Sequence, residues 1–206
     1  MLKVAVTGCA GSGKTSVCNR FKELGVKVIS SDVLAREVVA QDSPAYNKII
    51  NYFGKKVLTK DGSLNRRMLR RIIINDNIAR KALENFVHPE ITKLMHSQMI
   101  KAEKDGNHVV LVEVPLLFEL GIEDRFDVVI AVIADRKLRV KRLMDRDDVS
   151  REDAEALLNY QLPDEDKARR AEFVIKNGGS FAQTIRSVDH LYKDLVQKYV
   201  KEYESA

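Results

Sequence analysis

Five short runs of apolar residues recur along the chain, and most segments between them carry apolar residues at helical spacing. The runs lie at residues 2–7, 26–29, 108–114, 127–134 and 172–175. The third and fourth are apolar at nearly every position, which is typical of parallel strands covered on both faces. Strands that alternate with helices favour crossover connections between parallel neighbours. The pattern predicts an α/β fold with a mostly parallel five-stranded sheet.

Two segments break this alternation. Between about residues 62 and 106 there is no convincing strand, and apolar residues recur at helical spacing instead, which predicts consecutive helices. The second segment, at about 136–170, is dense in charged residues, and its Ser150-Arg-Glu-Asp153 string resembles a helix-start capping box. We therefore expect a core of residues 1–61 and 107–206 that contains the charged segment, and a helical insertion at 62–106.

Composition indicates a globular protein and suggests the charge of its partner. The chain has 206 residues, of which 45% are hydrophobic and 32% charged, enough for a sizeable core. Its net charge of +5 suggests an anionic partner, either a phosphorylated small molecule or nucleic acid. No basic stretch is interleaved with aromatic residues, no zinc-ligand spacing occurs, and no apolar run reaches membrane-spanning length. We expect a cytoplasmic protein that acts on a small molecule, without nucleic acid or membrane; the oligomeric state stays open.

The first apolar run leads into the most specific motif of the chain, Gly8-Cys-Ala-Gly-Ser-Gly-Lys-Thr15. A strand, a glycine-rich turn, Lys-Thr and an amphipathic helix together are the signature of a phosphate-binding loop. The glycines let backbone N–H groups point inward, and the following helix adds the positive end of its dipole. Lys14 offers a charge to the β- and γ-phosphates, and Thr15 offers a hydroxyl to Mg²⁺. The motif predicts a nucleotide and magnesium site that includes Gly11, Ser12, Gly13, Lys14, Thr15 and Ser16.

Two carboxylates follow strands at the sheet edge where open α/β folds bind ligands. Asp32 comes after the second apolar run, where it could accept a proton from an acceptor hydroxyl or cap the helix that begins there. Glu113 lies at the carboxyl end of the third run, one residue before its last, and a carboxylate in such an apolar strand needs a partner. Mg²⁺ is the natural partner beside a phosphate loop, and an ion pair with Lys or Arg is the alternative.

Arg142 and Arg146 lie four residues apart in the charged segment and therefore share a helix face. Their guanidinium groups could close over a transferring phosphoryl group and stabilise its charge. The alternative is an exposed helix face on which they pair with neighbouring aspartates, at Asp145, Asp147 and Asp148.

Short strings spread over nearly the whole chain, from Val4 to about Leu195, resemble the dephospho-coenzyme A kinase family and occur in that family's order. Beyond the phosphate loop they are Asp32 with Ala35-Arg36, Phe53-Gly54, Asp61-Gly-Ser-Leu-Asn-Arg66, His88-Pro89, Val114-Pro-Leu-Leu-Phe-Glu119, Arg142-x-x-x-Arg146-Asp147 and Val174-Ile-Lys-Asn177-x-Gly179. The phosphate loop is common to many enzymes. The Val-Pro-Leu-Leu-Phe-Glu string and the His-Pro pair, at this spacing from the loop, are much more specific to the family.

The resemblance implies a three-layer phosphate-loop kinase fold, with a helical insertion that binds the acceptor and a mobile lid at about 136–170. It implies transfer of the γ-phosphoryl group of ATP, with Mg²⁺, to the ribose 3′-hydroxyl of dephospho-coenzyme A. The products would be ADP and coenzyme A, in the last step of coenzyme A biosynthesis. It assigns proton acceptance to Asp32, support of the metal to Glu113, and closure over the phosphoryl group to Arg142 or Arg146.

Three further residues receive a role only through this resemblance. Arg66 and His88 match the acceptor-binding region of the family, although His88-Pro89 could also be a helix-start turn. Asn177 matches a loop near the adenine of ATP, and a plain turn is the alternative there.

The chain departs from the family pattern at several positions. The family has Gly-Ile where this chain has Cys9-Ala10, Asp-Ala-Asp at Ser30-Ser31-Asp32, Leu-Asp-Arg at Leu64-Asn65-Arg66, Asp at Glu113, and Arg at Leu157. None of these changes removes Lys14 or Asp32. The longer side chain of Glu113 must place its carboxylate differently at the metal. Loop N–H groups could favour a thiolate at Cys9, and the alternative is that the loop simply tolerates a small residue there.

Two other functions stay open at this point. One is a nucleoside or nucleotide kinase of the same architecture, which the strings in the insertion disfavour. The other is a nucleotide-dependent switch module, for which binding rather than transfer is the function. A small GTPase would carry an Asn-Lys-x-Asp string, and the chain has none.

Overall fold

The computed structural model describes residues 1–200, apart from the side chains of residues 74, 75, 199 and 200. The chain divides into two compact units. One unit is made of residues 1–30 together with the chain from residue 102 onward, and the other of residues 31–101. Each unit has an apolar core of its own.

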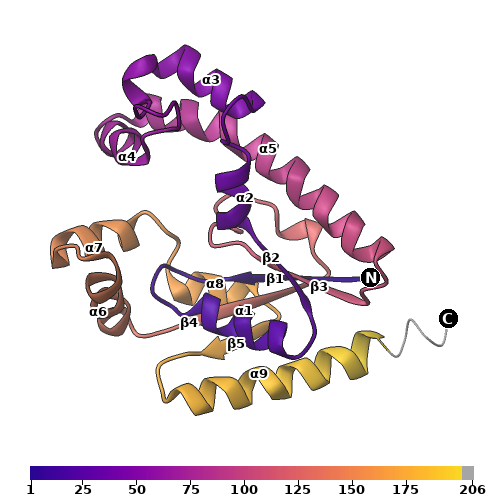
Figure 1. Cartoon of the computed structure of the whole chain (residues 1–206). Helices are drawn as coiled ribbons and strands as arrows, with labels where there is room; N and C mark the ends of the chain where they lie inside the picture. Colours follow the sequence, from indigo (N-terminus) through magenta and orange to yellow (C-terminus); the bar gives the residue numbers. More distant parts are fainter. Residues whose placement is uncertain (201–206) are drawn as a thin grey trace. The chain divides into compact units, whose positions relative to one another are not determined.

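The first unit is centred on a five-stranded sheet in which all neighbouring strands are parallel (Figure 1). The strand order is β2-β3-β1-β4-β5. β3 and β4 are buried at nearly every position, as their continuous apolar sequences predict. The predicted α/β class is confirmed. The strands are β1 (Leu2–Thr7), β2 (Lys27–Ser30), β3 (Val109–Glu113), β4 (Val128–Ile133) and β5 (Phe173–Lys176).

The register of the sheet brings the carboxyl ends of its central strands to one edge. Val6 of β1 lies opposite Glu113 of β3 and Ile130 of β4, and Ser30 of β2 also lies opposite Glu113. Open parallel sheets bind their ligands at this edge. The loop that follows β1 therefore begins next to the last residue of β3.

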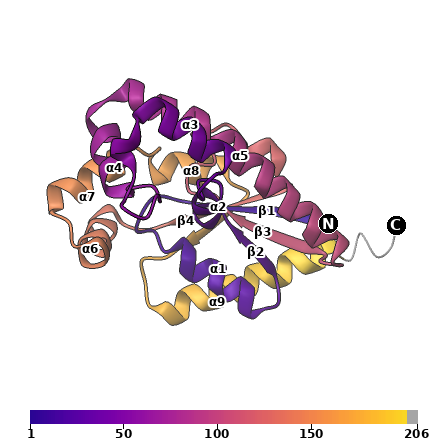
Figure 2. The ribbon, with the colours of Figure 1, turned by 45° about the horizontal axis from the view of Figure 1, so that its top comes forward.

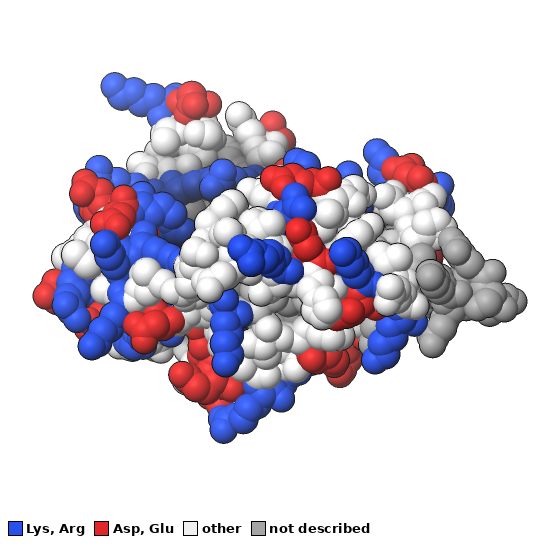
Figure 3. All heavy atoms as spheres, turned by 90° about the horizontal axis from the view of Figure 1, so that it is seen from below, with Lys and Arg blue, Asp and Glu red and all other residues white. Residues whose placement is uncertain are grey.

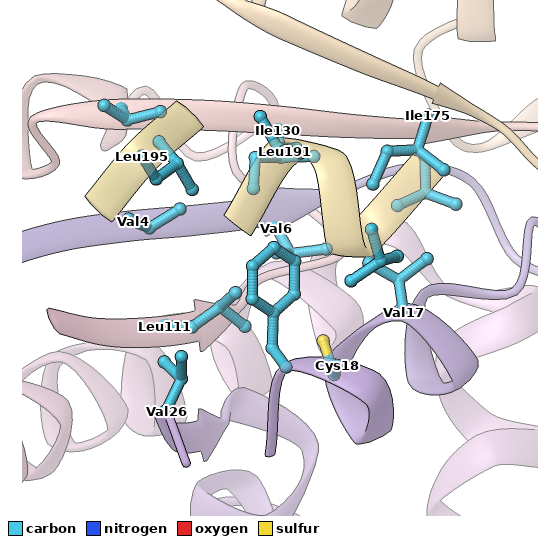
Figure 4. Packing of buried hydrophobic residues seen from close by; sticks show 14 of the residues in the cluster. Val4, Val6, Val17, Cys18, Val26, Leu111, Ile130, Ile175, Leu191 and Leu195 are labelled. Atoms are coloured by element: carbon cyan, nitrogen blue, oxygen red, sulfur yellow. The ribbon is translucent and has the colours of Figure 1, made fainter. Parts of the chain in front are cut away.

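Helices cover both faces of the sheet. α1 (Lys14–Glu23) and α9 (Phe181–Leu195) pack together on one face, and α8 (Asp164–Arg170) lies on the other (Figure 2). Figure 4 shows side chains of these two helices, among them Val17, Cys18 and Leu191, packed against Val6 and Ile130 of the strands. The three-layer arrangement that the family resemblance implies is confirmed.

The charged segment forms α6 (Arg136–Asp147), α7 (Arg151–Asn159) and α8. α6 and α7 pack on each other through a small cluster that contains Leu143 and Leu158. Ser150 caps α7 by accepting a hydrogen bond from the backbone N–H of Asp153 at 3.1 Å, as the sequence predicts. Two short elements, η2 (Glu123–Arg125) and η3 (Val196–Val200), complete the described part of this unit.

The second unit is built from helices. Its elements are α2 (Ser31–Glu37), α3 (Pro44–Phe53), η1 (Lys55–Val57), α4 (Arg66–Asn75) and α5 (Asn77–Lys104), of which α5 ends in the first unit. The predicted consecutive helices after residue 62 are confirmed. The unit begins at Ser31, earlier than the insertion expected from the sequence, because Ile49 and Phe53 of α3 share a core with Leu69 of α4.

Acidic and basic side chains are interspersed over the face of the molecule that Figure 3 shows. The net charge of +5 therefore does not form one continuous positive patch on that face. Within residues 1–200, none of the helices carries an apolar stretch of the length that a bilayer crossing requires.

Candidate active site

The phosphate loop joins β1 to α1 and depends on glycine at both of its ends. A Cβ atom on Gly8 would lie 2.2 Å from the carbonyl oxygen of Val132, and one on Gly13 would lie 1.8 Å from Nδ2 of Asn177. The φ angles of Gly8 and Gly13 are 145° and 92°, which other residues rarely adopt. Gly13 is the N-cap of α1 and provides no side-chain cap, so the first N–H groups of the helix can receive an anion.

The side chain of Lys14 folds back onto the phosphate loop. It is only 8% exposed, and its Nζ atom donates hydrogen bonds to the carbonyl oxygens of Gly8 at 3.0 Å and Cys9 at 3.1 Å. The hydroxyl oxygen of Ser12 is also buried and has no hydrogen-bond partner within the described part of the chain. A positive charge and an unsatisfied hydroxyl in one turn are what a bound phosphate would complement.

Thr15 and Glu113 come together where α1 begins and β3 ends. Oγ1 of Thr15 lies 3.4 Å from Oε1 of Glu113, and Glu113 is only 7% exposed. Hydroxyl and carboxylate oxygens are ligands that Mg²⁺ accepts. No group of three or more His, Cys, Asp or Glu side chains able to hold a metal occurs among the described residues. The residues therefore fit a magnesium ion that takes its other ligands from phosphate and water.

Arg142 of α6 reaches the phosphate loop, whereas Arg146 pairs with a neighbouring aspartate. The Nη1 atom of Arg142 donates to the carbonyl oxygen of Gly11 and Nη2 donates to that of Asn177, both at 3.1 Å. Arg146 is exposed and makes two hydrogen bonds to the carboxylate of Asp147, at 2.7 and 2.8 Å. The exposed, paired arrangement that the sequence left open thus describes Arg146 in this state, and Arg142 joins the loop to the end of β5.

Asn177 is buried directly behind the phosphate loop, with all its polar groups engaged. Its Nδ2 donates to the carbonyl oxygen of Ser12 at 2.8 Å, and its Oδ1 accepts from Oγ1 of Thr184 at 2.8 Å. Its backbone N–H donates to Ile133, and its carbonyl oxygen accepts from Arg142. The residue is therefore more than a plain turn, because it links β4, β5, α6 and α9 to the loop.

The end of the charged segment is fixed to the sheet. Lys167 of α8 has no exposed surface and donates to both carboxylate oxygens of Glu119, at 2.7 and 2.9 Å, and to the carbonyl oxygen of Pro115 at 2.9 Å. Asp164 is 3% exposed, pairs with Arg139 at 3.4 Å and accepts from the backbone N–H of Ala134. α8 thus belongs to the body of the first unit, and α6 and α7 are the part of the segment that could act as a lid.

Cys9 is a buried thiol. It is 1% exposed, and its Sγ atom donates to the carbonyl oxygen of Leu162 at 3.1 Å. Burial, and then Asp164, raise the pKa of Cys9 to about 12. The thiolate alternative for this loop residue is therefore wrong. Cys9 packs instead into the α6–α7 cluster with Ala10 and Leu157, which are also positions where the chain departs from the family pattern.

Asp32 lies in the second unit, at the start of α2. It is exposed and is the second residue of the helix, so it lies in the first turn and is not the N-cap. The capping interpretation of Asp32 is therefore wrong. The residue lies two positions after the strand residue Ser30, which pairs in register with Glu113.

Arg66 and His88 also belong to the second unit. Arg66 is exposed at the first position of α4, after the N-cap Asn65. His88 is half-buried and precedes Pro89 in the interior of α5. The His-Pro pair does not start a helix, because α5 begins at Asn77 and continues to Lys104.

Sequence reasoning missed Thr184, which supports the loop through Asn177, and the buried charged residues Arg139, Asp164 and Lys167, which fix the end of the charged segment. One signal was present for Thr184. It occupies the buried face of α9 together with Val188, Leu191 and Leu195, so it is a polar residue at a core position. Such a residue needs a hydrogen-bond partner, which here is Asn177.

The chain is similar to one protein family over most of its length. A family model described as dephospho-CoA kinase matches residues 2–183. A protein of Moorella thermoacetica named dephospho-CoA kinase is 41% identical over 196 residues, which is 95% of this chain and 92% of that protein. One of Bacillus cereus with the same name is 37% identical over 191 residues, covering 93% and 96% of the two chains.

Several solved structures are similar to the chain over nearly its whole length. A dephospho-CoA kinase from Campylobacter jejuni is 32% identical, with a TM-score of 0.72 over 95% of this chain and 97% of that one. TT1252 from Thermus thermophilus is also 32% identical, with a TM-score of 0.80 over 94% and 97%. A shikimate kinase from Acinetobacter baumannii shares the fold alone. Its TM-score is 0.54 at 16% identity, over 96% of this chain and 94% of that one.

Proposed function

The chain belongs to the dephospho-CoA kinase family, and we propose which of its residues carry the reaction. The protein is a kinase that uses ATP to phosphorylate the ribose 3′-hydroxyl of dephospho-coenzyme A, giving ADP and coenzyme A in the last step of coenzyme A biosynthesis. The observation that carries this conclusion is the family match over residues 2–183, which spans the phosphate loop.

We propose that residues Gly11 to Ser16 bind the phosphates of ATP. The buried ammonium of Lys14 supports this role, because it would exchange two loop carbonyl contacts for phosphate oxygens. The uncapped N-terminus of α1 adds N–H donors and the positive end of the helix dipole. Phosphoryl transfer depends mostly on such positioning and charge stabilisation.

Thr15 and Glu113 would hold Mg²⁺, as their facing oxygens support. When bound, the ion offsets negative charge on the phosphates during transfer. Glu113 is one methylene longer than the aspartate of the family pattern, and the buried end of β3 holds its carboxylate against Thr15.

Asp32 would act on the acceptor hydroxyl, as an orienting group and proton acceptor. Its exposure and its position in the first turn of α2 leave its carboxylate available for this role. Arg66 and His88 would bind the acceptor, with Arg66 offering its guanidinium to an acceptor phosphate. These roles make residues 62–106 the acceptor-binding part of the chain.

Arg142 and Arg146 would stabilise charge on the transferring phosphoryl group. Arg142 already contacts the phosphate loop, so it needs only a local change of partner. Arg146 would have to leave Asp147, and movement of α6 and α7 as a lid would allow this. Asn177 would act near the nucleotide through the loop it supports. We expect the enzyme to work in the cytoplasm on its small-molecule acceptor, independently of nucleic acid and membrane.

A coupled assay that follows ADP release tests these roles and the function together. We expect ADP release when ATP, Mg²⁺ and dephospho-coenzyme A are all present, and a loss of most of it when any one is omitted. An acceptor panel of adenosine, AMP and dephospho-coenzyme A checks the choice of acceptor. Turnover of nucleosides or nucleotides alone would contradict it, and slow ATP hydrolysis that ignores the acceptor would indicate a switch module.

A further inference from the structure

A buried polar chain runs from α9 to the back of the phosphate loop. Oγ1 of Thr184 donates to Oδ1 of Asn177 at 2.8 Å, and Nδ2 of Asn177 donates to the carbonyl oxygen of Ser12 at 2.8 Å. Thr184 is 1% exposed and Asn177 is 8% exposed. We infer that Thr184 is a positioning residue for ATP, which acts through Asn177 on the peptide that joins Ser12 to Gly13. The inference rests on the proposed role of this loop in binding phosphates.

Thr184 determines which way the amide of Asn177 faces. The carbonyl oxygen of Ser12 can only accept a hydrogen bond, so Nδ2 of Asn177 must face it. Oδ1 of Asn177 then faces Thr184, whose hydroxyl must be the donor. Without this hydroxyl, Oδ1 would be buried with no donor, which is a costly state. Relief of that cost would turn the amide away from Ser12.

The orientation of the Ser12 carbonyl in turn sets the direction of a loop N–H group. The described chain has no cis peptide bond, so the C=O of Ser12 and the N–H of Gly13 point in opposite directions. A carbonyl held toward Asn177 therefore directs the Gly13 N–H away from it. N–H groups of such a turn are the donors that hold phosphate oxygens. Asn177 approaches Gly13 so closely that no Cβ fits there, which is why this position requires glycine.

The start of α9 places Thr184 before any nucleotide binds. Ser180 and Gln183 form a capping box, in which the N–H of Ser180 donates to Oε1 of Gln183 at 2.8 Å and the N–H of Gln183 donates to Oγ of Ser180 at 3.3 Å. Gly179 leaves room for the Gln183 side chain, since a Cβ there would lie 2.2 Å from Oε1. Thr184 follows directly in this fixed first turn.

The test compares Thr184→Val, which keeps the shape and removes the donor, with Thr184→Ser, which keeps the donor. Ser187→Ala is the matched control, because Ser187 is exposed on the same helix and its hydroxyl donates only to the carbonyl oxygen of Gln183. We expect Thr184→Val to raise the KM for ATP roughly fivefold, the effect of about one hydrogen bond. The KM for dephospho-coenzyme A should change little. Thr184→Ser and Ser187→Ala should behave like the wild type.

A double-variant cycle shows whether Thr184 acts through Asn177. Asn177→Ala should raise the KM for ATP, and adding Thr184→Val to it should raise the KM no further. A folded Thr184→Val protein with the wild-type KM for ATP would overturn the inference, as would a lower melting temperature with an unchanged KM. Should valine prevent folding, Thr184→Ala removes the same donor and is judged by the same criteria. Absence of transfer in the wild type would instead contradict the proposed function.

Discussion

Lys167 and Glu119 form a partly buried ion pair in which Nζ of Lys167 lies 2.7 and 2.9 Å from the two carboxylate oxygens of Glu119. Lys167 has no exposed surface, and it also donates to the carbonyl oxygen of Pro115. Oε1 of Glu119 accepts a second hydrogen bond, from the backbone N–H of Leu162 at 2.9 Å. The pair therefore joins the loop after β3 to the chain that leads into α8.

Removal of one partner of this pair should destabilise the protein strongly. Lys167→Met keeps much of the side-chain volume and leaves the Glu119 carboxylate without its cation. We expect a loss of about 2–4 kcal/mol in the free energy of unfolding, somewhat below that of a fully buried pair because water reaches part of Glu119. Urea unfolding measures it, and Lys141→Met on the exposed face of α6 is the control. A loss no larger than that of the control would mean that the pair contributes little to stability.

Lys14→Ala should abolish transfer and leave the fold intact. Lys14 donates to two carbonyl oxygens of its own loop, and its proposed role is to hold charge that develops on the phosphates. We expect kcat/KM to fall at least about a hundredfold, the effect of one lost transition-state charge contact. Circular dichroism and the melting temperature check folding, and Lys22→Ala, on the exposed side of α1, is the matched control. Near-normal turnover in a folded Lys14→Ala protein would contradict the phosphate-loop assignment.

The sheet and the loop could be predicted from the sequence because their signals are local. Continuous apolar runs identify β3 and β4, and the glycine spacing identifies the turn after β1. The supporting contacts could not be predicted in the same way. Asn177 meets Ser12 across 165 residues of chain, and Lys167 meets Glu119 across 48. No local pattern encodes pairings at such separations.

The structure of the charged segment could likewise be predicted only in part from the sequence. High charge density indicates an exposed, mobile stretch, which fits Arg146 and the other exposed residues of α6. Composition alone does not distinguish these from Asp164 and Lys167, which are buried because partners elsewhere in the chain satisfy their charges. The part of the segment that could act as a lid is therefore α6 and α7, which is shorter than the stretch of about 136–170 expected from the sequence.

Asp32→Asn should remove most of the activity with little effect on stability. Asn is close in shape to Asp, and Asp32 is exposed, so few folding contacts change. An amide cannot accept the acceptor proton as a carboxylate does. The measurement is kcat beside the melting temperature, and Glu37→Gln, exposed on the same helix, is the control. Full activity in Asp32→Asn would exclude Asp32 as the base.

Cys9 should make the stability of the protein fall at alkaline pH. Its pKa rises from 9.0 to about 12 on folding, chiefly because burial disfavours the thiolate. Between these values the native state holds a proton that the unfolded chain has lost, so the free energy of unfolding decreases as pH rises. We expect the free energy of unfolding, measured with urea, to fall more steeply from pH 9 to 10.5 in the wild type than in Cys9→Ala. Equal slopes would show that the thiol does not titrate differently on folding.

Nucleotide and acceptor should order α6 and α7 but change α8 little. α6 carries more cations than anions, with Arg136, Lys141 and Arg146 exposed, and the Asp147 carboxylate offsets only part of this charge, so a bound anion should stabilise the segment. α8 is already fixed to the sheet through Asp164 and Lys167. Hydrogen exchange should therefore slow over residues 136–159 when a non-hydrolysable ATP analogue and dephospho-coenzyme A are both present. Exchange over residues 164–170 should be slow with or without them.

Kinetics of two arginine variants complete this last prediction. Arg142→Ala and Arg146→Ala should lower kcat more than they raise the KM for dephospho-coenzyme A, because their charge matters most as the phosphoryl group moves. Arg142→Ala should also raise the KM for ATP, since it removes the hydrogen bonds to Gly11 and Asn177. Arg151→Ala is the control, because Arg151 is exposed and pairs with Glu155 within α7. Unchanged exchange over residues 136–159, together with normal turnover in both variants, would leave Arg146 on a solvated helix face and Arg142 as a structural contact, with no role in transfer for either.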